Sequence, residues 1–109
     1  METVAVEAKF GYVSDEIKHR VLETIQSVQD KIDERICWRD DDTSIGYCVS
    51  MNEGTVLCVS VSEQGDKPNA SILPFLEEEL GEPSTLYASP SSLNPGVMIF
   101  YMMWKRVMH

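Results

Sequence analysis

A run of apolar residues at helical spacing constrains the fold of this chain more than any other feature of its sequence. Between residues 17 and 36 apolar side chains recur every three or four positions, and the opposite face of the segment is charged or polar. Ser14 is a candidate N-cap, and Asp15 and Glu16 suit a first helical turn. The pattern predicts a long helix with one side packed on a sheet; its apolar members are Ile17, Val21, Leu22, Ile25, Val28, Ile32 and Ile36.

A period of two predicts strands before and after this helix. Residues 3–10 alternate apolar and polar side chains, as a half-buried strand does. Residues 44–51 and 55–62 flank Gly54 and predict a hairpin, with the glycine in the left-handed turn position.

The hairpin register follows from pairing Met51 with Thr55. That pairing predicts a core face made of Ile45, Tyr47, Val49, Met51, Leu57, Val59 and Val61. The other face then carries small side chains, with Cys48 opposite Cys58.

The second half of the chain predicts one more helix and one or two strands. Ser71 can cap a helix that runs through Leu80, with Pro74 in its first turn and Gly81 ending it. Residues 85–88 suit a short strand, and residues 97–106 suit the last one. The 109 residues therefore predict a single α+β domain of order βαββα(β)β, in which two helices cover one face of an antiparallel sheet, as in a ferredoxin-like sandwich. Such a fold says nothing by itself about function.

The charge balance narrows the classes of partner. Eighteen acidic residues oppose nine basic ones, for a formal net charge of −9, which disfavours direct binding to nucleic acid or to anionic lipid. An acidic surface suits a protein partner with a basic surface, although the charge can equally serve solubility alone. No segment is long and apolar enough for a membrane span, and no signal peptide is indicated, so we expect a soluble chain.

The cysteines predict neither a disulfide scaffold nor a zinc site. Cys37, Cys48 and Cys58 are odd in number and lack C-x-x-C spacing, and His19 and His109 lie far from them in sequence. We therefore expect no metal and no cofactor, and a reducing, cytoplasmic setting.

The last strand is apolar on both faces, which a sheet with one open face does not need. One face carries Val97, Ile99, Tyr101 and Met103, and the other carries Met98, Phe100, Met102 and Trp104. We expect the second set to contact a partner, most simply another copy of the chain in a homodimer. The alternative is a central strand covered on both sides within one chain, in which these residues are core.

Two acidic clusters are further candidates for contacts with a basic partner: Asp40, Asp41 and Asp42 in a loop, and Glu77, Glu78 and Glu79 near the end of the second helix. Neither has the ligand spacing of a calcium loop, and consecutive helical positions diverge by about 100°. The alternative is solvated surface charge.

No catalytic motif is present, so the sequence favours a non-enzymatic protein. The first hypothesis is a small acidic protein-binding module, an adaptor or an inhibitor of the immunity or phage-antagonist type, that occupies a partner's surface. The alternative is a dimeric domain that senses a small molecule. An apolar pocket near Tyr12, Trp38, Tyr47 and Tyr87 would support this alternative. A third is a small enzyme that combines Cys48 or Cys58 with His19 on the open sheet face.

Overall fold

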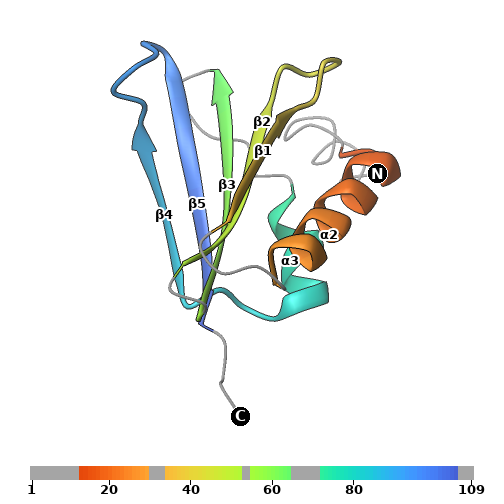
Figure 1. Cartoon of the computed structure of the whole chain (residues 1–109). Helices are drawn as coiled ribbons and strands as arrows, with labels where there is room; N and C mark the ends of the chain where they lie inside the picture. Colours follow the sequence, from red (N-terminus) through yellow and green to blue (C-terminus); the bar gives the residue numbers. More distant parts are fainter. Residues whose placement is uncertain (1–12, 30–33, 53–54, 65–71, 106–109) are drawn as a thin grey trace, which may run out of the picture.

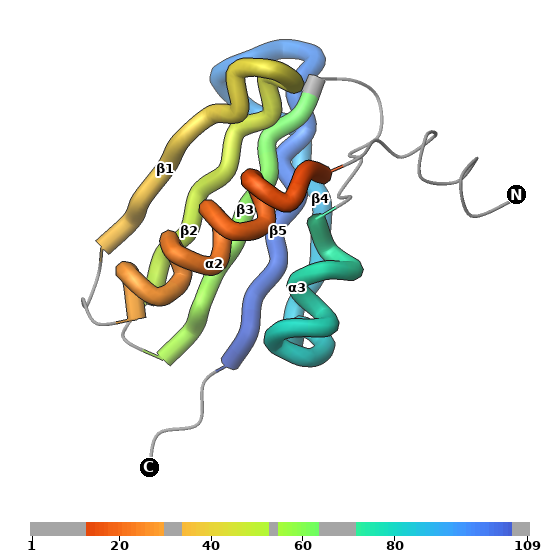
Figure 2. Tube along the Cα trace, turned by 90° about the vertical axis from the view of Figure 1, so that its right-hand side faces the viewer, coloured from red at the N-terminus to blue at the C-terminus, as the bar shows by residue number. Residues whose placement is uncertain are grey.

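The computed structural model describes residues 13–29, 34–52, 55–64 and 72–105 and shows an α+β fold (Figure 1). Its elements are α2 (Asp15–Gln29), β1 (Arg35–Arg39), β2 (Gly46–Asn52), β3 (Val56–Gln64), α3 (Leu73–Leu80), β4 (Thr85–Pro90) and β5 (Val97–Lys105). The strands form one antiparallel sheet of order β1-β2-β3-β5-β4, so β1 and β4 are its edges within this part of the chain. Both helices lie on the same face of the sheet (Figures 1 and 2).

The predicted α+β class with an antiparallel sheet and two helices is therefore confirmed. The ferredoxin-like order is not, because β1 was not expected and β3 pairs directly with β5. The strand predicted at residues 3–10 lies outside the described residues. Neither described helix is long and apolar enough to cross a membrane.

The first helix ends earlier than predicted. Ser14 caps it as expected, since its hydroxyl oxygen accepts a hydrogen bond from the Ile17 N–H at 3.2 Å. The helix stops at Gln29, and Ile36, predicted to be helical, lies in β1. Ile36 and Trp38 alternate there with more exposed neighbours and pack against the core, so a period of two fits this segment better than the helical one.

The hairpin is confirmed, with its register shifted by two residues. Met51 lies opposite Leu57 instead of Thr55. An even shift leaves every side chain on its predicted face. The core face is therefore as expected, whereas Cys48 lies opposite Ser60 and not opposite Cys58.

The core fills the space between the sheet and the two helices. Its buried members come from Val13 and α2 (Ile17, Val21, Ile25, Val28), from the hairpin (Tyr47, Val49, Met51, Leu57, Val59, Val61), from Ile72 and Leu76, and from β5 (Met102, Trp104). α3 has Pro74 in its first turn and ends at Gly81, both as predicted; the expected cap, Ser71, lies outside the described residues. The indole N–H of Trp104 donates to the Gly81 carbonyl at 2.9 Å, which ties the end of β5 to the end of α3.

Candidate functional site

The sheet face opposite the helices, here called the open face, is covered by no described element (Figures 1 and 2). The pairing of the strands fixes which side chains stand on it. Tyr101 lies between Ser60 of β3 and Tyr87 of β4, and Met103 lies between Cys58 and Thr85. These neighbours share the open face with the remaining odd-numbered residues of β5, namely Val97, Ile99 and Lys105.

The residues predicted to contact a partner lie on the other face. Met102 and Trp104 are buried in the core and Phe100 packs against it, because β5 pairs Phe100, Met102 and Trp104 with the core residues Val61, Val59 and Leu57. Met98 lies opposite the buried Glu63 on this same face. The placement of this set on an open surface is therefore wrong, and the core alternative describes Met102 and Trp104.

A hollow of about 370 Å³ lies in the open face. Its floor consists of small side chains from the two strands of the hairpin, β2 and β3: Cys48, Ser50, Cys58 and Ser60. Larger side chains border it, with Tyr87, Tyr101 and Met103 on the β4–β5 side and Glu34, Arg35 and Asn52 on the β1–β2 side. The hollow arises because two neighbouring strands carry small residues between strands that carry large ones.

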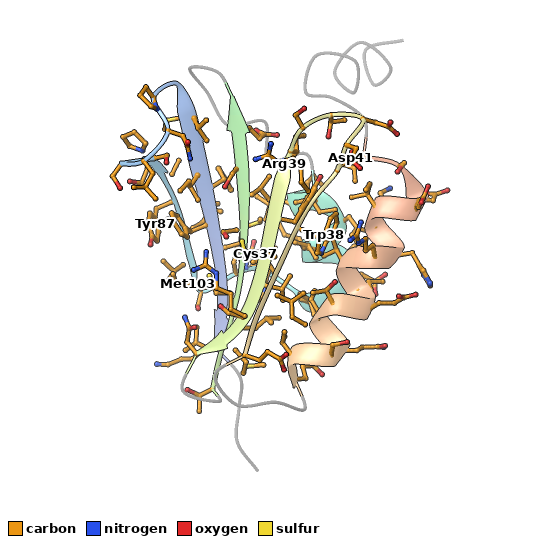
Figure 3. The ribbon with its side chains drawn as sticks, turned by 45° about the horizontal axis from the view of Figure 1, so that its top comes forward. Cys37, Trp38, Arg39, Asp41, Tyr87 and Met103 are labelled. Carbon is orange, nitrogen blue, oxygen red and sulfur yellow. A yellow bond between two sulfur atoms is a disulfide. The ribbon has the colours of Figure 1, made fainter. Side chains whose placement is uncertain are left out.

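The β4–β5 border is aromatic. The rings of Tyr87 and Tyr101 stack with centroids 4.8 Å apart and an interplanar angle of 18°. Tyr87 is 45% exposed, so a large part of its ring is open to contact. Figure 3 shows Tyr87 and Met103 on the side of the sheet away from α2, and Trp38 on the helix side. Tyrosine and methionine are enriched where proteins bind other proteins.

A disulfide closes the β1 side of the open face. Cys37 and Cys48 are directly opposite in the register of β1 and β2, with Cα atoms 4.1 Å apart, and their sulfur atoms are bonded. The expectation of no disulfide is therefore wrong, and the bond is at odds with a reducing compartment. The prediction missed it because Cys37 was assigned to the segment after a helix, where it has no strand partner.

The third cysteine remains a thiol on the floor of the hollow. Cys58 is buried, and this burial raises the pKa of its thiol, while the Arg35 charge and a hydrogen bond with Ser50 act in the opposite direction. The Arg35 guanidinium also donates to the Cys48 sulfur at 3.6 Å. Because burial is the largest effect, Cys58 is held as a neutral thiol and is a weak nucleophile.

The two acidic clusters are not part of this site. Asp40 stabilises the β1–β2 turn, since its carboxylate accepts hydrogen bonds from the Asp42 N–H at 3.2 Å and the Thr43 hydroxyl at 2.7 Å. Asp41 and Asp42 are exposed in that turn. Glu77, Glu78 and Glu79 belong to α3, on the helix side of the sheet (Figure 1). Within the described residues, no group of three His, Cys, Asp or Glu side chains is arranged to hold a metal ion.

Two other predicted groupings are not assembled. His19 is exposed on α2, where its Nε2 lies 2.6 Å from Glu23 Oε1, on the opposite side of the sheet from Cys58. Trp38 stacks on Tyr47 at 4.6 Å on the helix side, whereas Tyr87 is on the open face, and Tyr12 lies outside the described residues. Of the four aromatic residues whose shared pocket would have supported a sensor, only Tyr87 borders the hollow.

The chain matches no known family model, and no curated protein or solved structure is significantly similar to it.

Proposed function

We propose that this chain is a small protein-binding module, an adaptor or inhibitor that occupies a partner's surface with its open face and catalyses no reaction. The observation that carries the proposal is the exposed aromatic border beside the hollow, with Tyr87 stacked on Tyr101 and no described element over them. Rigid aromatic side chains next to a depression supply large contact area at a small cost in conformational entropy.

The distribution of charge supports different roles for the open face and for the acidic clusters in binding a partner. The strand positions of the open face carry Arg35, Arg39 and Lys105 but no acidic residue among those described, although Glu34 borders the hollow beside Arg35. The acidic clusters lie at the β1–β2 turn and on α3 instead. We infer that the open face provides affinity, and that the acidic clusters accelerate association with a basic partner.

The test compares the proteins captured from a cell extract by variants of the chain. Tyr87→Ala combined with Met103→Lys removes the exposed ring of the aromatic border and adds a charge. His19→Ala is the matched control on the exposed side of α2. A true partner is retained by the wild type and the control and is lost from the double variant, whose melting temperature stays close to that of the wild type. An identical set of captured proteins for all three would contradict the proposal.

The contribution of the acidic clusters is tested separately with the captured partner. Charge reversal at Asp41 and Asp42, or at Glu78 and Glu79, is expected to slow association and to weaken its dependence on salt while leaving the fold intact. Stopped-flow or surface-based kinetics at two salt concentrations measure this. If neither pair changes the association rate, these clusters serve solubility alone.

The cytoplasmic setting belongs to the same proposal. In that compartment Cys37 and Cys48 would be kept as two thiols, because glutathione and thioredoxin reduce accessible disulfides. Rapid alkylation in lysed cells, followed by mass measurement, counts these thiols. Full protection of both would place the chain in an oxidising compartment.

A second candidate, a dimeric domain that senses a small molecule, is favoured by the chemistry of the hollow. Its volume lies within the range of small-molecule sites. Ser60 on its floor is only 8% exposed and supplies a hydroxyl group to the hollow. A small organic acid that raises the melting temperature of the wild type but not of Arg35→Ala would favour this function, since Arg35 is the cation at the border.

A further inference from the structure

The large hydrophobic side chains exposed in the described part of the chain gather at one edge of the sheet. Leu86 is 47% exposed, Tyr87 45% and Leu93 87%; the first two lie in β4 and the third in the connection to β5. Almost every residue of β4 is exposed. The edge formed by β4 is therefore the most apolar exposed region that the structure describes.

The opposite edge differs in charge. β1 carries Arg35 and Arg39, and charged side chains are a common means of preventing edge-to-edge pairing of sheets. No charged residue occurs between Glu82 and Lys105, a segment that includes all of β4. In a chain with a net charge of −9, two copies can approach through this neutral edge with little repulsion.

The backbone of β4 also has hydrogen-bonding groups directed away from the sheet. The Ser91 N–H donates to the Val97 carbonyl at 2.9 Å, in line with the register of β4 and β5. Because residues bonded to one neighbouring strand recur at every second position, Tyr87 and Ser89 are bonded toward β5. The N–H and C=O groups of Leu86 and Ala88 therefore point to the outside, whereas Pro90 has no N–H to offer.

We propose that β4 pairs antiparallel with β4 of a second copy, across a two-fold axis at Tyr87 and perpendicular to the sheet. In this register Leu86 lies opposite Ala88 of the partner subunit, and Ala88 lies opposite Leu86 of the partner subunit. Both pairs exchange N–H to C=O hydrogen bonds, four in all, because these are the outward-pointing residues. The two described five-stranded sheets become one continuous sheet.

The neighbouring two-fold registers are poorer. An axis at Ala88 would place Leu86 opposite Pro90 of the partner subunit, which lacks an N–H. An axis at Leu86 would place Ala88 opposite Ser84 of the partner subunit, whose N–H is already donated to the Met103 carbonyl at 2.8 Å. The axis at Tyr87 pairs both the N–H and the C=O of Leu86 and of Ala88, whereas each neighbouring register leaves one of these carbonyls unpaired.

The side chains agree with this register. The two Tyr87 side chains meet at the axis and extend the Tyr87–Tyr101 stack of each copy into one aromatic row. The two Leu86 side chains cover apolar surface on the helix side, where each is half exposed in the single chain. This seam replaces the one expected at residues 97–104, and it leaves both open faces uncovered on the same side, so the inference goes beyond the proposed function.

The first test is the solution mass of the whole chain by light scattering over a range of concentrations. The wild type is expected to have twice the 12.3 kDa of one chain. Leu86→Lys places a charge at the seam and Ala88→Pro removes an outward N–H, so each should weaken dimerisation at least about tenfold. Leu93→Lys, the same change in the exposed turn, is the matched control and should leave the dimer intact.

A monomeric wild type at all concentrations, or a dimer that persists in both edge variants, would overturn the proposal. If Ala88→Pro does not fold, Leu86→Lys decides alone, because its strand keeps every hydrogen bond to β5. Failure of the wild-type dimer to capture any partner would count against the proposed function and not against this pairing.

The register has its own test. Tyr87→Cys should form a disulfide between copies under mild oxidation, since residues facing each other without mutual hydrogen bonds have Cα atoms about 4.5 Å apart. Thr85→Cys is the control, because the two Thr85 positions would be separated by four residues along the strands, or about 13 Å. Cross-linking of Thr85→Cys in preference to Tyr87→Cys would refute the axis at Tyr87.

Discussion

Trp104 offers a quantitative check on which face of β5 is covered. Its side chain is 5% exposed, packs in the core and donates its indole N–H to the Gly81 carbonyl at 2.9 Å. Trp104→Phe removes that hydrogen bond, worth about 1 kcal/mol, and leaves the Gly81 carbonyl to water. The smaller ring also leaves a gap, which we put at about 1 kcal/mol by scaling from the ~3–5 kcal/mol of complete truncation to alanine.

The expected loss of about 2 kcal/mol is a large part of the ~5–15 kcal/mol that stabilises a typical domain. With an unfolding entropy of about 2.1 cal/mol/K per residue, it lowers the melting temperature of this chain by ~9 °C. Urea unfolding followed by far-ultraviolet circular dichroism, with thermal melts alongside, measures both quantities.

The matched control is Met103→Ala, one residue earlier on the open face. It should cost less than about half as much, because one side of its side chain is already in solvent. Wild-type stability for Trp104→Phe together with a large loss for Met103→Ala would mean that the two faces have been exchanged.

Three further predictions concern titration and sulfur chemistry. Burial, with the charges of Asp40 and Glu63, raises the pKa of Tyr47 to about 12. Since the pKa in the unfolded chain is about 10, up to ~2.7 kcal/mol of folding free energy present below pH 10 is lost as the pH rises toward 12. Unfolding measured from pH 9 to 11.5 should show this loss in the wild type but not in Tyr47→Phe. The Cys37–Cys48 bond spans 11 residues, so a thiol reductant should destabilise the folded chain by about 2.8 kcal/mol. The reductant should have no effect on the variant that combines Cys37→Ser with Cys48→Ser. Equal melting curves of the wild type with and without reductant would contradict a structural role for the bond. Burial raises the pKa of Cys58, so iodoacetamide at pH 8 should label it slowly in the folded chain and rapidly in urea, and equal rates would place the thiol in solvent.

The hairpin and the ends of α3 could be predicted from sequence because their signals are local. Alternation fixes the two faces of β2 and β3 whatever the register, so an error of two positions changed no face. Pro74 and Gly81 mark the first turn and the end of α3 through their own backbone preferences.

The segment around β1 could not be predicted in the same way. Ile36 fits a helix when read with Val28 and Ile32, and fits a strand when read with Trp38. Pairing with β2 makes this segment a strand and not the end of the helix. This pairing is a tertiary contact, so the local sequence does not reveal it. The error also hid the disulfide, because Cys37 meets Cys48 only when both lie in paired strands.

The candidate site depended on a similar choice. Both faces of β5 are apolar, so alternation could not tell which one the helices cover. The register with β3 gives the answer, because the core face of β3 was predicted correctly. Met102 lies opposite Val59 and therefore shares that core face. A signal was present in Trp104, since a buried tryptophan needs an acceptor for its N–H and the end of α3 supplies one.

The Cys37–Cys48 bond also determines how this sheet loosens. Strands open from the edges of a sheet inward, and local opening of an edge strand costs far less than global unfolding. β1 cannot leave without β2 while the two are covalently joined, whereas β4 is held to the sheet by its hydrogen bonds to β5 and by few buried side chains. In a single chain, amide exchange should therefore spread from one side, fastest in β4 and slowest in the hairpin. A second copy paired at β4 would slow exchange at the very strand that opens first.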